Sequence, residues 1–383
     1  MLKRKMRLFL LTFFLIYGGI HLFGFVKLNY ALSLSLRANV PIGLFMMIMI
    51  LSPWLIRVVD RSEHVVLARI FAHVGYFWMG FLFLFFAASV FIDGYRLLVC
   101  LAKAISGKGL SVLVISAPVS FFIPLLLAVL CSIYGYFAAL NIRTEHVLIP
   151  TAKMPAGIAR IRIVQISDVH MGLIVQQERL ERILQKVQKA GPDLLVSTGD
   201  LVDGQGRHLP DMMDMFRRIR PLYGKYAVTG NHEFYAGLDY AVDLTEKGGF
   251  VMLRGRGVTI AGLLNIAGVD DPAGKYSGLG LYVPEKEILS ALPRKYFTVL
   301  LKHQPQVDQG ALGLFDLQLS GHTHNGQIFP FNFAVRRFFP LVTGTIRLLD
   351  HAWLHVSRGS GTWGPPIRFL SPPEVTVIDL MNS

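Results

Sequence analysis

The sequence predicts a chain of two parts, a set of membrane-spanning helices followed by an α/β domain. Residues 1–140 consist mostly of long apolar runs, whereas the sequence from Asn141 onward alternates short β-rich runs with polar helical stretches. The chain of 383 residues is 53% hydrophobic and only 16% charged, which is too apolar for a soluble protein of this length. At about 100–200 residues per domain, we expect a transmembrane region over residues 1–145 and a second domain over residues 146–383.

Four apolar stretches are long enough to cross a bilayer, because a spanning helix needs about 20 apolar residues. The first stretch begins with basic residues, but its apolar core is too long for a signal peptide and no small-residue cleavage site follows, so we expect it to be retained. A short stretch at 95–105 carries Arg96 and Lys103 and is expected to form a separate interfacial helix. The expected spans are 8–28, 40–59, 67–92 and 112–140.

The distribution of charge argues for a membrane protein and against a nucleic-acid partner, despite the formal net charge of +13. Residues 1–140 hold 12 Lys/Arg and 3 Asp/Glu, whereas residues 141–383 hold 26 and 22, so most of the excess flanks the spans. With the N-terminus inside, the inner segments hold eleven basic residues and the outer segments five. Because basic residues favour the inner side, we expect a multi-pass protein of the cell membrane with a cytoplasmic C-terminal domain.

The second domain reads as strands that alternate with amphipathic helices, the pattern of an α/β sandwich. The runs IRIVQI (161–166), LLVSTG (194–199) and YAVTG (226–230) are expected strands, and FTVLLKH and DLQLSGH follow later. The run QERLERILQKVQKAGPD is an expected helix that ends at a Gly-Pro pair, and DMMDMFRRIR is another. The two cysteines, Cys100 and Cys131, have the spacing of neither a zinc site nor a disulfide framework.

Each predicted strand ends in residues that bind metals well. The clusters are SDVH, TGD, TGNH, LLKH and SGHTH, and loops at the carboxyl ends of strands are where α/β sheets build their sites. Asp168 and His170 are two residues apart, so in an extended chain their side chains point the same way. Asp200 follows Gly199, which lets the backbone turn sharply. A carboxylate at that position can bridge two cations.

The residues in these clusters form a mixed nitrogen and oxygen ligand set that suits Mn, Fe or Zn. Seven ligands are too many for one tetrahedral ion, and they suit two divalent ions about 3.5–4 Å apart that share Asp200. Single clusters of this kind are common in proteins, but five in this order are not expected by chance. The candidate metal ligands are Asp168, His170, Asp200, Asn231, His303, His322 and His324.

The series DVH, GD, GNHE, KH and GHTH resembles the calcineurin-like metallophosphoesterase superfamily, and FLSPPEVTVIDL resembles its membrane-associated branch. The resemblance covers about residues 160–380 and implies a four-layer α/β/β/α sandwich. It also implies that His232 does not bind metal but faces the scissile phosphate and donates to the leaving oxygen. It assigns Asp168, His170, Asp200 and His324 to one metal, and Asp200, Asn231, His303 and His322 to the other.

The expected function is therefore that of a membrane-anchored, metal-dependent phosphoric ester hydrolase. A hydroxide that bridges the two ions would attack a phosphoester or pyrophosphate, most simply of a lipid or lipid-linked substrate. Two alternatives are a phosphoesterase of soluble or nucleic-acid phosphodiesters and a non-enzymatic membrane receptor with a vestigial metal fold. The complete ligand set argues against the receptor. The sequence indicates neither the substrate, nor a preference for monoesters or diesters, nor the oligomeric state.

The stretch NGQIFPFNFAVRRFFPLV (325–342), directly after the last candidate ligand, has two interpretations. The alternating Phe329, Phe331 and Phe333 predict an extended segment, and in one interpretation this is a strand whose aromatics pack into the core. In the other it lies at the membrane interface, where Arg336 and Arg337 bind lipid phosphates, each contributing about 1 kcal/mol near an anionic surface.

Other polar residues are given secondary roles. Asp203 either orients a ligand or forms a turn before Gly204, and the turn is favoured. Asp270 and Asp271 either border the site or form a strand-ending turn. Lys302 is expected to point away from the site, and Arg358 lies in a glycine-rich loop that could approach a phosphate. The three histidines without partners in the sequence are expected to be structural or surface residues, and they are His208, His351 and His355.

Overall fold

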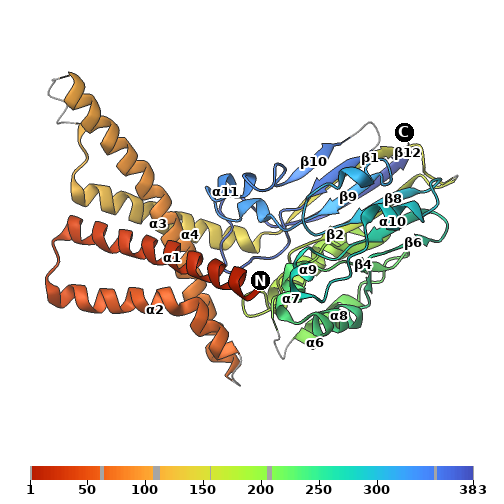
Figure 1. Cartoon of the computed structure of the whole chain (residues 1–383), viewed down its shortest axis with the longest axis horizontal. Helices are drawn as coiled ribbons and strands as arrows, with labels where there is room; N and C mark the ends of the chain where they lie inside the picture. The colour runs from red at the N-terminus through yellow and green to blue at the C-terminus, as the bar shows by residue number, and fades with distance from the viewer. Residues whose placement is uncertain are drawn as a thin grey trace. The chain divides into compact units, whose positions relative to one another are not determined.

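The computed structural model describes residues 2–60, 64–106, 113–155, 157–204, 209–348 and 352–382, and its elements are drawn in Figure 1. The chain forms two compact units. The first contains Met1–Phe137 with Gly364–Phe369, and the second contains Ala138–Trp363 with Leu370–Ser383. The domain boundary between residues 145 and 146 stays a prediction. His208 and His351 lie outside the described residues.

The first unit contains four helices that are long and apolar enough to cross a membrane, in agreement with the sequence. Their outward side chains are mostly Leu, Ile, Val and Phe, and an apolar surface of this kind is stable in a bilayer, where a helix satisfies its own backbone groups. The helices are α1 (Leu2–Leu32), α2 (Leu36–Asp60), α3 (Val65–Ser106) and α4 (Ala117–Leu140).

The separate interfacial helix expected at residues 95–105 is wrong, because these residues continue α3. That helix has 42 residues, which at 1.5 Å per residue make it about 63 Å long, roughly twice the thickness of the hydrocarbon core. Its end therefore extends beyond the hydrocarbon. Gly94, directly before this stretch, does not break the helix. A glycine in a helix interior costs only about 1 kcal/mol, which is too little to end a helix that the neighbouring residues favour.

Polar contacts join the helices inside this unit. Lys27 Nζ lies 2.6 Å from Asp93 Oδ2, which pairs α1 with α3, and Trp78 Nε1 donates to His21 Nε2 at 2.9 Å. The local sequence pattern does not indicate the pairing of Lys27 with Asp93. The segment Gly364–Phe369 belongs to the same unit, where the backbone N–H of Arg368 donates to Gly135 O at 2.9 Å.

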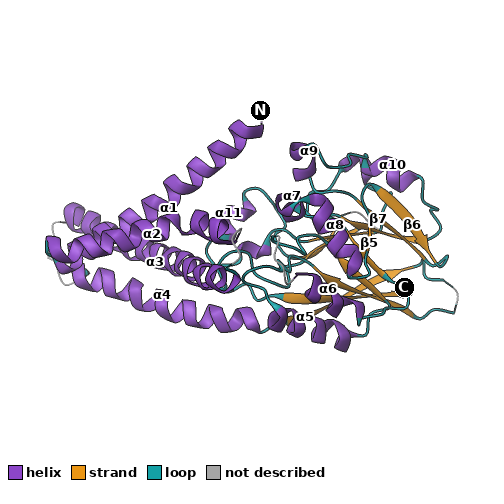
Figure 2. Ribbon diagram, turned by 90° about the horizontal axis from the view of Figure 1, so that it is seen from below, coloured by secondary structure: helices purple, strands orange, loops and turns teal. Residues whose placement is uncertain are grey.

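The second unit contains two six-stranded mixed sheets (Figure 2). The first sheet has the order β1-β12-β2-β3-β4-β5 and the second β10-β11-β9-β8-β7-β6. The strands of the first sheet are β1 (Arg143–Thr151), β2 (Arg160–Ile166), β3 (Leu194–Ser197), β4 (Lys225–Ala227), β5 (Val251–Met252) and β12 (Glu374–Asn382). Those of the second are β6 (Arg256–Ile260), β7 (Leu264–Gly268), β8 (Phe297–Leu301), β9 (Leu317–Ser320), β10 (Gly344–Arg347) and β11 (Trp353–Val356).

Helices connect the strands, and most are short. The longest, α5 (Gln177–Ala190), has apolar residues at i, i+3, i+4 and i+7 and is capped by Gly191, which has a φ of 61°. The predicted Gly-Pro stop is thereby confirmed. The other α-helices of this unit are α6 (Leu209–Arg217), α7 (Asn231–Ala236), α8 (Leu238–Lys247), α9 (Ala273–Ser277), α10 (Glu285–Ser290) and α11 (Asn332–Arg336).

Three apolar clusters show that the unit has four layers. On β2, Val164 packs with residues of α5, α6 and α8, whereas the neighbouring Ile163 packs between the two sheets. On β8, Leu300 packs with Ile288 of α10 on the far side of the second sheet. Each fully buried side chain of this type contributes about 1.5–3 kcal/mol. The order is helix, sheet, sheet, helix, so the predicted α/β/β/α sandwich is confirmed.

Candidate metal centre

The candidate ligands lie just past the carboxyl ends of strands in both sheets. Asp168 and His170 follow β2, and Asp200 follows β3, its parallel neighbour. Asn231 follows β4 and begins α7. In the second sheet, His303 follows β8, and His322 and His324 follow β9, again a parallel neighbour. The carboxyl ends of parallel neighbours share one edge, so each sheet collects its ligands there.

The backbone at these ligands adopts an unusual conformation. Asp168, His170, Asp200, His322 and His324 all have positive φ, between 48° and 71°. The left-handed region costs a residue with a side chain roughly 1–2 kcal/mol, and such residues gather at functional sites when the surrounding structure holds them there. The extended conformation expected at Asp168 and His170 is therefore wrong, although their side chains still converge.

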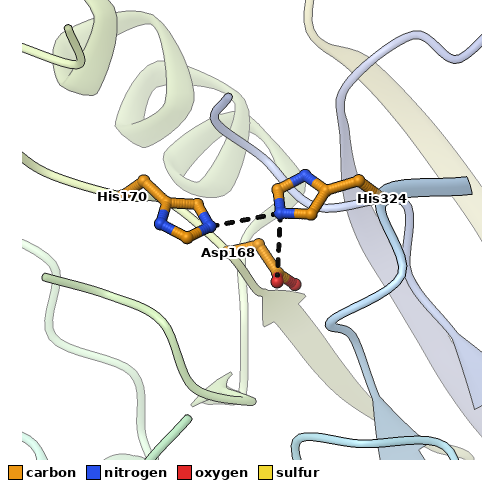
Figure 3. A group of neighbouring side chains, drawn as sticks. All are labelled: Asp168, His170 and His324. Carbon is orange, nitrogen blue, oxygen red and sulfur yellow. Dashed lines mark hydrogen bonds and ion pairs between the residues drawn. The ribbon is translucent and has the colours of Figure 1, made fainter. Parts of the chain in front are cut away.

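The first group of ligands contains Asp168, His170 and His324, whose ligand atoms all lie within 4.8 Å of one another. Figure 3 shows the two imidazoles facing each other directly, with the carboxylate to one side of them. His170 Nε2 is 3.1 Å from His324 Nε2, which in turn is 3.4 Å from Asp168 Oδ1. Ser167 Oγ donates to Asp168 Oδ2 at 2.5 Å, which leaves Oδ1 toward the histidines.

The second group contains Asp200, His303 and His322. His303 Nε2 lies 3.2 Å from Asp200 Oδ2 and 3.1 Å from His322 Nδ1. His303 Nδ1 is 2.8 Å from the carbonyl oxygen of Thr198, so Nδ1 carries the proton and Nε2 is the candidate ligand nitrogen. Asp200 is also within 3.8 Å of His170 Nε2, and it is therefore adjacent to both groups.

This arrangement fits two cations. Nitrogen atoms of neighbouring imidazoles face each other at 3.1 Å in both groups, and a cation between them satisfies both lone pairs. Asn231 Oδ1 is buried and accepts no hydrogen bond from the described residues, which costs about 1–3 kcal/mol unless a ligand compensates. Burial, and then the neighbouring His303, lower the pKa of His322 to about 3.

His232 and Asp203 form a pair at the edge of the first group. His232 Nδ1 is 2.5 Å from Asp203 Oδ1, and His170 Nδ1 is 3.4 Å from the same oxygen. Burial lowers the pKa of His232, but the Asp200 and Asp203 carboxylates outweigh burial and raise it to about 9. The ligand atoms of His232, His170 and Asp200 also lie within 4.8 Å of one another. Asp203 therefore contacts two histidines, which favours the ligand-orienting interpretation, and a turn that begins at Asp203 would extend outside the described residues.

Glu233 holds the turn that carries Asp200, a role that the sequence analysis missed. Its carboxylate accepts hydrogen bonds from the backbone N–H groups of Asp200, Leu201, Val202 and Gly230 at 2.6–3.2 Å. The side chain is 2% exposed. Glu233 lies three residues after the N-cap Gly230 and accepts its N–H, which is one half of a capping box, and a glutamate at that spacing was the available signal.

Two glycines are required by close packing against ligand carboxylates. A Cβ on Gly321 would overlap Ser167 Oγ and Asp168 Oδ2, and a Cβ on Gly230 would overlap Asp200 Oδ1. Any side chain at either position must displace the carboxylate.

The aromatic segment, residues 329–341, is neither an extended segment nor a core strand, so both structural expectations are wrong. It consists of turns around α11, which has no buried residue. Phe331, Phe333 and Phe338 are 47%, 61% and 74% exposed. Phe339 instead lies against the candidate ligand His322, with 5.2 Å between ring centroids. Arg336 and Arg337 lie on the same segment, in and directly after α11.

Of the remaining candidates from the sequence, Asp271 lies beside the site, whereas Asp270 and Lys302 form ion pairs with other residues. Asp271 borders the site, in a pocket that Asn231 and His322 also line, whereas Asp270 pairs with Arg254 at 2.9 Å. Lys302 points away, as predicted, and donates to Glu285 Oε1 at 2.5 Å.

Two further residues, Arg358 and His355, contact side chains of the first sheet. Arg358 pairs with Glu145 and with Glu374, and the approach of its loop to a phosphate stays a prediction. His355 is buried, and its two nitrogens lie 2.8 Å from Thr345 Oγ1 and 3.3 Å from Thr376 Oγ1, which confirms a structural role.

Comparison with known proteins agrees with this geometry. The calcineurin-like phosphoesterase family matches residues 161–326, which include all seven candidate ligands. A protein of Aquifex aeolicus named as an uncharacterized metallophosphoesterase is 39% identical over 255 residues, which cover 66% of this chain and 97% of that protein. A zebrafish (Danio rerio) transmembrane protein with metallophosphoesterase domain is 31% identical over 273 residues, covering 68% of this chain and 62% of that protein.

A further relative and a solved structure are each similar to part of this chain. The Bacillus subtilis metallophosphoesterase YkuE is 32% identical over 269 residues, which cover 65% of this chain and 90% of that protein. The crystal structure of the Thermus thermophilus protein TT1561 is 16% identical, with a TM-score of 0.36 over 53% of this chain and 90% of that chain. Together, the family match and the Aquifex relative show that this chain belongs to the calcineurin-like phosphoesterases, as a member that carries candidate membrane-spanning helices.

Proposed function

We propose that this protein hydrolyses a phosphoester of a lipid or lipid-linked substrate at a centre that holds two divalent transition-metal ions, Mn, Fe or Zn. The proposal joins three features: two adjacent ligand groups, an exposed aromatic segment in contact with one of them, and four candidate spans. The alternatives from the sequence are a phosphoesterase of soluble or nucleic-acid substrates and a vestigial receptor.

In this proposal, each ligand group holds one ion. Asp168, His170 and His324 would hold one ion, and Asn231, His303 and His322 the other. Asp200 would bind both, since its carboxylate is adjacent to both groups. When bound, two such ions polarise phosphoryl oxygens and activate water for hydrolysis.

His232 would donate a proton to the leaving oxygen. Asp203 engages its Nδ1, which leaves Nε2 as the nitrogen that can face a substrate. The backbone N–H of His232 also donates to Asp200 Oδ1 at 2.8 Å, which ties the position of the imidazole to the centre. Asp203 would hold the ring in one orientation, so the donor is in place before substrate binds.

The observation that carries the lipid part of the proposal is the contact of the aromatic segment with His322. Three exposed phenylalanines and two arginines on one short segment match a membrane interface, where rings lie at headgroup depth and arginines bind lipid phosphates. The occupant that we propose is the bilayer that the four helices span. A lipid substrate bound along this segment could reach the ligands without leaving the membrane.

The test replaces the outward residues of the segment and leaves Phe339 in place, because Phe339 contacts a ligand. Phe331, Phe333, Phe338, Arg336 and Arg337 are changed to serine in the full chain. Turnover of a phospholipid panel in vesicles with Mn²⁺ is compared with turnover of bis(p-nitrophenyl) phosphate. We expect lipid turnover to fall at least tenfold while turnover of the soluble diester stays within about twofold.

A matched control changes two exposed apolar residues elsewhere, Leu222 and Tyr282, each 77% exposed, to serine. It should leave both activities unchanged. Equal losses on both substrates in the segment variant would show a structural role. Full retention of lipid turnover would show that lipid reaches the centre elsewhere. Absence of any chelator-sensitive hydrolysis by the natural chain would contradict the enzymatic proposal itself.

A further inference from the structure

A pocket of about 320 Å³ adjoins the second ligand group. Pockets for small ligands span roughly 300–1,000 Å³, so this one suits a group the size of a single ring. Both Asn231 and His322 line it, and anything bound there lies beside the proposed reaction centre. The other lining residues are Tyr235, Asp271, Pro272, Ala273, Tyr276, Gln304 and Gln306.

The polar part of the pocket is an acidic and amide surface. Asp271 is 3% exposed, and its carboxylate accepts from Gln304 Nε2 at 2.9 Å and from the N–H of Ala273 at 2.8 Å. An ionised carboxylate has about four lone-pair sites, so it can accept further hydrogen bonds. Gln304 and Gln306 add amide groups that both donate and accept. The lining includes no lysine or arginine among the described residues.

The apolar part of the pocket is a pair of tyrosines on neighbouring helices. Tyr235 lies on α7 and Tyr276 on α9, and they are 58% and 56% exposed. The two helices touch, since a Cβ on Gly274 would lie 2.6 Å from Phe234 Cζ. Tyrosine combines a flat apolar ring with a hydroxyl, which suits a ligand with C–H faces and hydroxyl edges.

We propose that this pocket binds a neutral, polyhydroxylated group, a sugar or glycerol, attached to the scissile phosphate. Hydroxyls of that group would donate to Asp271 and pair with the two glutamine amides, and its carbon skeleton would lie against the tyrosines. The negative charge of Asp271 would repel a second phosphate. A choline group offers no hydrogen-bond donor, and it would leave the amides unpaired.

This proposal rests on the proposed function and makes it more specific. His322 contacts Phe339 of the aromatic segment and also lines the pocket. One organic group of the substrate would therefore follow the segment, and the other would enter the pocket. A substrate with two organic groups on one phosphorus is a phosphodiester, so we expect a diester with a lipid on one side and a hydroxylated headgroup on the other.

The experiment compares octyl phosphodiesters that differ only in the second group: glyceryl, glucosyl, ethyl, choline and phosphoglyceryl. The full chain in detergent with Mn²⁺ is assayed by mass spectrometry of the products. We expect kcat/KM for the glyceryl or glucosyl diester to exceed that for the ethyl diester at least tenfold. The glyceryl and glucosyl arms distinguish the two sources of hydroxyls.

Variants of the pocket test whether it causes this preference. Tyr276→Ala and Gln306→Ala should each lower the ratio of glyceryl to ethyl kcat/KM at least fivefold, mainly through KM. Asp271→Asn keeps the shape and removes the charge, so it should relax discrimination against the phosphoglyceryl diester, an effect that a structural role would not produce. Tyr282→Ala, an exposed tyrosine outside the pocket lining, is the matched control and should leave every ratio unchanged.

The outcomes separate this proposal from the proposed function. Metal-dependent hydrolysis of all diesters at equal rates would overturn the pocket proposal and leave the phosphoesterase intact. Preference for the choline diester would overturn it in favour of a cation site. Hydrolysis of none of the octyl diesters or membrane lipids would overturn both proposals.

Discussion

His232 is the residue whose proposed role is most sharply defined by its neighbours. Asp203 Oδ1 lies 2.5 Å from the Nδ1 atom of His232. A nitrogen of His232 also lies within 4.8 Å of the ligand atoms of His170 and Asp200. We predict that His232→Ala retains metal and loses roughly 10²–10⁴-fold in kcat, the range for general acid catalysis. Elemental analysis of the purified variant, together with kcat for a soluble diester, tests this.

Asp203→Asn is the companion variant, because it keeps the size of the side chain and weakens its hold on His232. We expect a smaller loss of kcat than in His232→Ala, with metal again retained. If His232→Ala loses metal, the histidine is a ligand and the proposed donor role is wrong.

Asp200 and Asn231 should differ in how much metal they hold. Asp200 is adjacent to both ligand groups, whereas Asn231 lies beside His322 in the pocket lining. We predict that Asp200→Ala removes both ions and reduces turnover to background, and that Asn231→Ala weakens only one. Metal per chain, measured after dialysis, checks this, and full metal content and turnover in Asp200→Ala would rule out the shared ligand.

At the scale of elements, the centre depends on loops that pack without room for side chains. Gly321 joins β9 to the two histidines of its loop, and a Cβ there would overlap Asp168 Oδ2. We predict that Gly321→Ala displaces Asp168, lowers metal content and costs about 1–3 kcal/mol of stability through overpacking. The measurements are metal content, turnover and thermal unfolding in detergent.

Gly310→Ala is the matched control, because a Cβ there would meet Asp308 Oδ1 at 3.4 Å, an ordinary contact. It should keep metal and activity. Normal metal content in Gly321→Ala would show that the loop can move, and that Asp168 does not need the position seen here.

At the scale of the whole molecule, the charge around the four helices predicts on which side of the membrane the catalytic unit lies. Eleven basic residues flank the spans on the proposed inner side and five on the outer side. We predict that the catalytic unit is cytoplasmic, since basic residues are retained on that side. C-terminal fusions to a reporter that is active only inside the cell and to one active only outside test this, and activity of the outside reporter alone would reverse the orientation.

The local pattern of the sequence was enough to predict several parts of this protein. The four helices follow from the length of their apolar runs, because a bilayer imposes a minimum length. The strands β2, β3 and β8 follow from short β-rich runs that end in glycine or polar residues. The ligand clusters follow from residue types at strand ends, where parallel neighbours bring their carboxyl ends together.

Only the tertiary structure decided the features that depend on contacts between distant residues. Asp203 meets His232 and Glu233 meets Asp200 across about thirty residues, and neither spacing is periodic. The aromatic segment turns around α11 and places Phe339 on His322, although its alternating phenylalanines resemble a strand. The pocket combines α7, α9 and the loop after β8. Local periodicity reports which face of an element is apolar, but packing alone determines which loops meet and which side chains they bring together.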